Sequence, residues 1–190
     1  MNCLLSNIEF YNTPDGTIMV KAYEQPVRAL VSSDRGLIQA MLSVIRELYP
    51  DAFSKLAELY SRHERNHILY EFNIVSRFIR CNFGEYDQYN YDIDHTGTFH
   101  FEEVRCPLRG TIDCAYEGCI CKPILNTNLT EREKEVLSLI GQGLQSKDVA
   151  NELHISITTV HRHRENIKAK LKLKTVGELV NYWMKYFNAK

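Results

Sequence analysis

Residues 130–171 carry the start and stop signals of three short helices in close succession. Thr130–Glu133 reads Thr-Glu-Arg-Glu, a capping box in which the first and last side chains each satisfy the other residue's backbone N–H. A Gly-Gln-Gly run ending at Gly143 predicts the end of this first helix, because glycine tolerates the left-handed turn that closes a helix. Ser146 and Ser156 are the predicted caps of the next two helices. This spacing predicts a helix-turn-helix.

The predicted third helix has two chemically different faces. Val160, Ile167 and Leu171 recur at helical spacing, so we expect them in the core. The other face is entirely polar and consists of Thr158, His161, Arg162, Glu165 and Lys168. A helix that is anchored along one edge and polar along the other fits the DNA major groove, which is about 12 Å wide.

Charge is distributed unevenly along the chain. Residues 126–190 contain 11 Lys and Arg against 7 Asp and Glu, whereas residues 1–125 contain 12 against 17. The positive charge is concentrated in residues 156–174, which hold Arg162, Arg164, Lys168, Lys170, Lys172 and Lys174. Such a stripe indicates contact with a polyanion, and a solvated helix face is the alternative.

About the last 60 residues resemble the LuxR/GerE-type DNA-binding domain. The motifs that carry the resemblance occur in order, at Leu129–Leu137, Gly143–Ala150, Leu153–Ser156, Thr159–Val160, His163, Asn166–Ile167 and Lys170–Leu171. The resemblance implies a four-helix domain whose third helix reads double-stranded DNA and whose fourth helix supports a homodimer. The predicted fourth helix, Val176–Phe187, has a wide apolar stripe formed by Leu179, Val180, Trp183, Met184 and Phe187. This stripe exceeds what a small core needs, so it indicates a partner surface.

The resemblance also implies roles for single residues of the interface. His161, Arg162 and Glu165 would face the bases, and Lys147, Thr158, Thr159 and Lys170 would face phosphates. Arg164 and Lys168 belong to the basic stripe and are assigned to the same interface. Many family members have Lys where this chain has His161, so no base preference is carried over. A structural role is expected for His163.

The chain is expected to be mainly helical, with a boundary between residues 1–124 and 125–190 at the linker Pro123–Asn128. The first part begins with a pattern typical of a hairpin around Pro14–Gly16. Periodic apolar residues then predict three amphipathic helices, within residues 33–48, 53–60 and 68–81. Alternation over residues 98–104 predicts a strand before a Cys-rich segment, residues 104–123. The predicted fold is therefore a helical domain with a small β and Cys-rich part, followed by a four-helix LuxR-type domain.

Two common sensor types do not fit residues 1–124. A phosphoacceptor receiver domain alternates strands and helices, whereas this region has three successive helices, and Asp51 opens a helix instead of ending a strand. Acyl-homoserine-lactone sensors have a pocket rich in Trp, and the single Trp of this chain is Trp183.

Four cysteines lie close together in the Cys-rich segment, at Cys106, Cys114, Cys119 and Cys121. Thiolates in a Gly- and Pro-rich stretch suit Zn²⁺, with an iron–sulfur cluster as the alternative metal centre. The spacing lacks the paired Cys-x-x-Cys of common zinc ribbons, so a reversible disulfide and free thiols remain alternatives to a metal centre. Cys81 or His100 can replace one ligand.

These features predict a sequence-specific, DNA-binding transcription regulator controlled by a metal- or redox-responsive Cys cluster. The alternative is an enzyme or a protein-interaction module that carries a DNA-binding tail, for example with Cys81 as nucleophile and His95 or His100 as base. The chain has no Gly-rich phosphate loop, nucleophile elbow or zinc-protease His pair, so an enzyme is not expected. Without a basic signal region or an apolar run of about 20 residues, we expect a cytoplasmic protein that does not enter a membrane.

Overall fold

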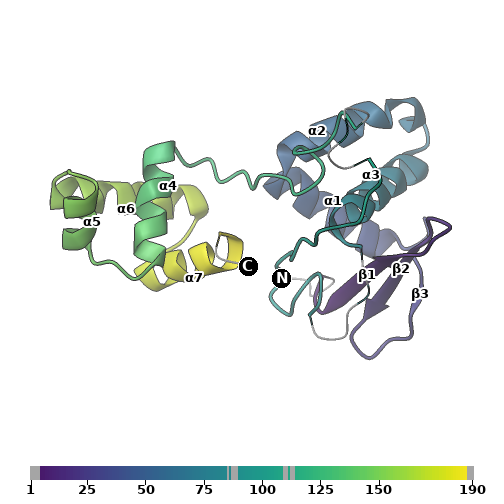
Figure 1. The fold of residues 1–190 in the computed structure, drawn as a ribbon, viewed down its shortest axis with the longest axis horizontal. Coiled ribbons are helices and arrows are strands. Elements are labelled where there is room, and N and C mark those ends of the chain that lie inside the picture. Colours follow the sequence, from purple (N-terminus) through teal and green to yellow (C-terminus); the bar gives the residue numbers. More distant parts are fainter. Residues whose placement is uncertain (1–4, 85, 87–89, 109–110, 112–113, 188–190) are drawn as a thin grey trace. The chain divides into compact units, whose positions relative to one another are not determined.

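A computed structural model of the chain describes residues 5–84, 86, 90–108, 111 and 114–187. The chain divides into two compact units, Met1–Leu125 and Asn126–Lys190. Helices dominate both units, and the first also contains a small sheet (Figure 1). The expected mainly helical class is confirmed.

The sheet of the first unit has three antiparallel strands in the order β1 (Ile8–Asn12), β2 (Ile18–Ala22) and β3 (Arg28–Ala29). Phe10 pairs with Val20, and both side chains are buried on the same face of the β1–β2 hairpin. The turn between the strands places Gly16 at φ +85°, which glycine adopts without strain. The hairpin expected around Pro14–Gly16 is confirmed.

Three helices pack together beside this sheet (Figure 1). They are α1 (Arg35–Leu48), α2 (Pro50–Leu59) and α3 (His67–Asn82), with a 3₁₀ turn, η1 (Ser61–His63), between the last two. The predicted periodicity is confirmed, since Ile38, Met41 and Ile45 of α1 are fully buried. Proline fits the first turn of α2 because its missing N–H would have no partner there.

The strand expected over residues 98–104 is wrong. Phe99 pairs with Ile93, and Ile93 with Ile8, only through isolated bridges. The predicted alternation reflects side-chain packing instead, because Phe99 and Phe101 both lie against the ring of Phe78 from α3. An extended segment can bury alternate rings in this way without a continuous strand beside it.

The second unit contains four helices around its own core (Figure 1). They are α4 (Glu131–Gly141), α5 (Ser146–Glu152), α6 (Ile157–Leu171) and α7 (Val176–Tyr186). Helix α4 packs against α6 and α7, and α5 packs against α6. The predicted capping box is confirmed by both of its hydrogen bonds at the start of α4, and a second capping box begins α7.

None of the described helices is long and apolar enough to cross a bilayer.

Candidate nucleic-acid interface

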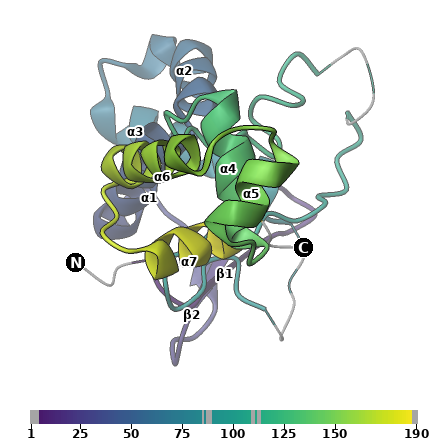
Figure 2. The same ribbon diagram turned by 90° about the vertical axis from the view of Figure 1, so that its left-hand side faces the viewer.

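Helix α6 has one buried edge and one exposed edge. Val160 and Ile167 are 0% exposed, and Leu171 packs against the same core. The exposed residues include four of the predicted polar face, namely Thr158, His161, Arg162 and Glu165. Figure 2 shows α6 beside α4 and α5, which cover its buried edge. The predicted helix therefore presents hydrogen-bonding side chains to solvent.

The first turn of α6 is fixed by its cap. The hydroxyl of Ser156 accepts a hydrogen bond from the Thr159 backbone N–H at 3.1 Å, as the sequence predicts. The hydroxyls of Ser156 and Thr159 also lie 2.8 Å apart. The turn before the helix uses His154 at φ +52°. These contacts hold the start of α6, the part of a recognition helix that contacts base edges.

Two basic residues of the predicted interface have partners within the unit. Lys168 lies 2.8 Å from the carboxylate of Glu165, one turn earlier on α6. Arg164 donates a hydrogen bond to the Ser146 hydroxyl and so joins α6 to α5. Both contacts orient side chains along the helix. Their predicted role at DNA stays a prediction.

Other interface residues extend into solvent. Lys147, His161 and Arg162 are exposed, and within the described part of the chain no hydrogen bond or ion pair engages their side chains. The positive charge of Arg162 and Lys147 is therefore available to an incoming ligand. The guanidinium group of Arg162 can donate two parallel hydrogen bonds to one pair of acceptor atoms.

Lys170 has a structural partner that the sequence did not reveal. Its Nζ lies 2.6 Å from the carboxylate of Glu133, which is 4% exposed and belongs to the capping box of α4. Burial alone would raise the pKa of Glu133, but hydrogen bonds from Lys170 and Thr130 outweigh it and hold that pKa below its usual value. Lys170 thus compensates a buried charge between α4 and α6, and its contact with phosphates stays a prediction.

The prediction that Ser146 caps α5 is wrong. Gln145 is the capping residue and makes no side-chain cap hydrogen bond, while Ser146 is the first helical residue. The Ser146 hydroxyl instead accepts the hydrogen bond from Arg164. This contact joins residues 18 positions apart, so a local cap pattern does not predict it.

Helix α7 combines buried and exposed apolar residues. Leu179 is fully buried, and Trp183 packs against the same core. Met184 and Phe187 are 50% and 43% exposed. The predicted apolar stripe of α7 is thus wider than the part that the core buries.

His163 is half-buried on α6, and its Nδ1 is buried without a hydrogen-bond partner in the described structure, which agrees with a packing role.

The four cysteines predicted as metal ligands are partly buried free thiols. The thiol of Cys119 lies 3.7 Å from the Asp51 carbonyl oxygen at the start of α2. Cys121 instead follows Ile120, whose carbonyl oxygen accepts a hydrogen bond from the Asn82 side chain at the end of α3, next to Cys81. Burial raises the pKa of Cys81 to about 12, and Cys121 adds to this shift. Cys119 and Cys121 thus have different neighbours, and the unit of Cys106, Cys114, Cys119 and Cys121 stays a prediction.

The three residues named for the alternative enzyme function, Cys81, His95 and His100, interact with residues outside that set. Cys81 contacts Cys121, and Nε2 of His100 lies 3.1 Å from the Asp94 carboxylate. His95 contributes its backbone oxygen to a hydrogen bond from Ser6.

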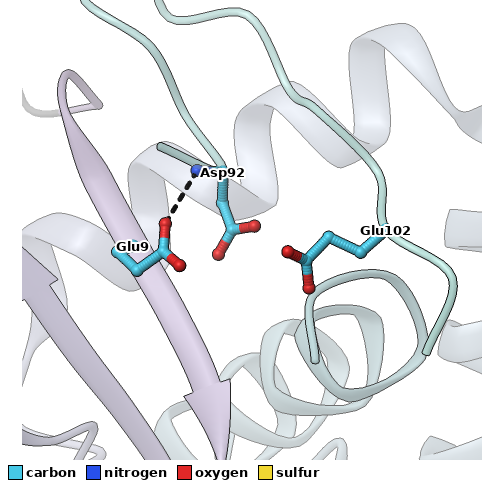
Figure 3. Close-up of side chains that lie close together, drawn as sticks. All are labelled: Glu9, Asp92 and Glu102. Carbon is cyan, nitrogen blue, oxygen red and sulfur yellow. Dashed lines mark hydrogen bonds between the residues drawn. The ribbon is translucent and has the colours of Figure 1, made fainter. Parts of the chain in front are cut away.

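Three carboxylates that the sequence did not reveal lie together in the first unit (Figure 3). Within the described residues, Glu9, Asp92 and Glu102 form the group of potential ligands whose atoms lie within 4.8 Å of one another. Glu9 accepts a hydrogen bond from the Asp92 N–H at 3.2 Å, and Glu102 accepts one from the Gly84 N–H at 2.7 Å. Asp92 itself accepts from the Phe10 N–H at 2.6 Å. These contacts tie the 92–102 segment to β1 and to the end of α3.

Known proteins match the second unit. The GerE family, described as bacterial regulatory proteins of the luxR family, matches residues 127–183. "Oxygen regulatory protein NreC" of Staphylococcus epidermidis (strain RP62A) is 46% identical over 57 residues, or 30% of this chain and 26% of that protein. The proteins of the same name from Staphylococcus haemolyticus and Staphylococcus carnosus are 46% and 44% identical over the same length. This chain spans about a quarter of the length of these curated relatives.

No solved structure matches the chain. The family match begins just before the capping box of α4 and ends within α7, so it includes both helices of the helix-turn-helix. The resemblance predicted from the sequence motifs is confirmed. Residues 127–183 of this chain are a domain of the luxR family of bacterial regulatory proteins.

Proposed function

We propose that this protein is a transcription regulator that binds double-stranded DNA through α6. The observation that carries the proposal is the pairing of a fully buried apolar edge on α6 with an exposed edge containing Thr158, His161, Arg162 and Glu165. Such a helix can enter the major groove while its other side remains packed. The luxR-family match over the same residues and the regulatory relatives support this function.

The electrostatics of the unit agree with such a ligand. Residues 126–190 have four more basic than acidic residues, and much of this charge lies on or next to α6. Arg162 and Lys147 carry positive charges in solvent, whereas Lys170 neutralises Glu133 inside the unit. Arg162 is therefore assigned to base contact, and Lys147 to the phosphate backbone.

The test begins with selection of duplexes from a random DNA pool by the full chain. Arg162→Ala should then raise the Kd for the selected duplex about 5- to 150-fold, because a bidentate base contact contributes about 1–3 kcal/mol. It should also relax the preference at one base position. Fluorescence anisotropy with labelled duplexes measures both effects.

The matched control is Lys134→Ala, which removes one positive charge from α4, where Lys134 pairs with Glu131 at 2.7 Å. This variant should bind the selected duplex nearly as tightly as the parent protein. Equal losses in the two variants would mean that α6 does not read the bases. A pool without any enriched sequence would contradict the proposed function itself.

We further propose that α7 pairs two copies of the chain on DNA. Met184 and Phe187 leave an apolar surface on a helix whose other side is in the core. Met184→Asp should leave the unit folded, because this side chain is 50% exposed, and should give a monomer that binds single half-sites weakly. Sedimentation velocity with and without DNA measures the change. A dimer that persists unchanged in Met184→Asp would exclude this surface.

Finally, we propose that thiol chemistry in residues 104–123, with Zn²⁺, an iron–sulfur cluster or a disulfide as the candidates, controls DNA affinity. The segment precedes the linker to α4, and its Cys121 contacts Cys81 on α3. A change at these thiols alters how the end of the first unit is held, which is a route from a metal or redox signal to the second unit.

A further inference from the structure

A fully buried asparagine at the end of α3 holds two distant segments of the chain. Asn82 is 0% exposed, and its carbonyl oxygen accepts a hydrogen bond from the Glu102 N–H at 2.9 Å. Its side-chain amide donates to the Ile120 carbonyl oxygen at 2.8 Å, and its side-chain oxygen accepts from the Lys122 N–H at 2.7 Å. Asn82 thus fixes the residues on both sides of position 121.

Each of the three segments that meet at Asn82 carries a cysteine. Cys81 is the preceding residue of α3, Cys121 lies between the two clamped residues, and Cys106 follows Glu102 by four positions. The Cys121 and Cys106 thiols both add to the rise in the pKa of Cys81, which agrees with this convergence of the three segments. The hydrogen bonds of Asn82 therefore bring together three segments that each carry a cysteine.

The segment that carries Cys106 is held close to α3 by packing as well. A Cβ added to Gly84 would lie 3.0 Å and 3.1 Å from the two methyl groups of Val104. The Val104 side chain therefore packs tightly against the backbone at Gly84, just after α3, and Val104 lies two residues before Cys106. Cys119 belongs elsewhere, since its thiol lies against the Asp51 carbonyl oxygen on α2.

We propose that Cys81, Cys106, Cys114 and Cys121 form a binding site for a thiophilic divalent cation of the Zn²⁺ class. Cys81 takes the place of Cys119 in the set predicted from sequence, and Cys114 is kept from that set. The proposal deepens the proposed thiol control of residues 104–123 and rests on it. The thiols release their protons to solvent on binding, and four thiolates give the tetrahedral sulfur set that zinc prefers.

Binding requires a local rearrangement. Within the described residues, no three cysteine sulfurs lie within 4.8 Å of one another, so Cys106 and Cys114 have to move toward the Cys81–Cys121 pair. Both are in the stretch between Val104 and Ile120, which contains no helix or strand in its described part. The Asn82 clamp holds the residues on either side of Cys121 next to α3, so the movement falls on Cys106 and Cys114.

The test uses Co²⁺ as a spectroscopic probe, titrated anaerobically into the reduced, chelator-treated full chain. The parent protein and Cys119→Ser should each bind one Co²⁺ per chain with the thiolate-to-metal absorption of a tetrahedral site, which Zn²⁺ should displace. Cys81→Ser and Cys121→Ser should each weaken binding by more than about 100-fold, because loss of a ligand costs more than loss of an outer-shell contact.

A second measurement needs no variant. Zn²⁺ should protect Cys81, Cys106, Cys114 and Cys121 of the parent protein from alkylation and leave Cys119 reactive, as read by peptide mass spectrometry. The assignment is overturned if Cys81→Ser binds Co²⁺ like the parent, if Cys119→Ser loses binding, or if Zn²⁺ protects no thiol. Purified protein with a Cys81–Cys121 disulfide that binds no metal after reduction would also overturn it. Sequence-specific DNA binding, measured on the same samples, separates this outcome from failure of the proposed function.

Discussion

Gly141→Ala should destabilise the second unit by at least about 2 kcal/mol, because overpacking a filled site costs about 1–3 kcal/mol and sometimes more. A Cβ at Gly141 would overlap the Cγ and Cδ2 atoms of the Trp183 ring. The ring is rigid, so α7 or the whole indole has to move. Alanine favours a helix over glycine by about 1 kcal/mol at an interior position, and Gly141 is the last residue of α4. The clash therefore outweighs the gain.

Trp183 is the single tryptophan of the chain, so its fluorescence reports unfolding of this unit alone. Urea unfolding followed at this tryptophan measures the effect. Gly177→Ala is the matched control, because a Cβ there meets nothing closer than Thr175 Oγ1 at 3.9 Å. Gly177→Ala should leave stability unchanged or slightly higher. Equal unfolding midpoints for the two variants would show that Trp183 does not pack on Gly141.

Asn82→Leu should have a comparable effect on the first unit. Leucine keeps the branched shape and the number of non-hydrogen atoms of the side chain but removes the hydrogen bonds to the Ile120 oxygen and from the Lys122 N–H. Leaving a buried polar group unsatisfied costs about 1–3 kcal/mol, so the loss should reach about 2–6 kcal/mol for the two groups. The segment around Cys121 should detach from α3 before the rest of the unit unfolds.

Two measurements separate local detachment from general unfolding. Far-ultraviolet circular dichroism follows the helices, and the alkylation rate of Cys121 follows the segment. Asn73→Leu makes the same chemical change at a half-buried position of the same helix. This control should alter neither the circular dichroism signal nor the alkylation rate of Cys121. If Asn82→Leu leaves both stability and the alkylation rate at the parent values, the clamp is not a stabilising contact.

The second unit was the more predictable part of the chain because its signals are local. The capping box at Thr130, the cap at Ser156 and the left-handed glycine at Gly143 each act within a few residues. Such signals depend on backbone groups that every helix end leaves unsatisfied. The periodicity of Val160 and Ile167 then identified the buried edge of α6.

Contacts between distant residues were not predictable from these patterns. Lys170 was assigned to phosphates, yet it pairs with Glu133, 37 residues away. The contact between Cys81 and Cys121 and the acidic group around Asp92 likewise join segments whose proximity depends on the packing of the whole unit. Cysteine spacing indicated thiol chemistry, but it could not show that α3 supplies one of the thiols.

The most direct test of the account is the specificity ratio of the full chain. It compares the Kd for a duplex recovered by selection with the Kd for a shuffled duplex of the same composition, at one salt concentration. Specific regulators prefer their sites by about 10³-fold or more, and we expect a ratio in this range that falls in Arg162→Ala. Equal affinities for the two duplexes, from folded protein, would contradict the claim that α6 reads DNA sequence.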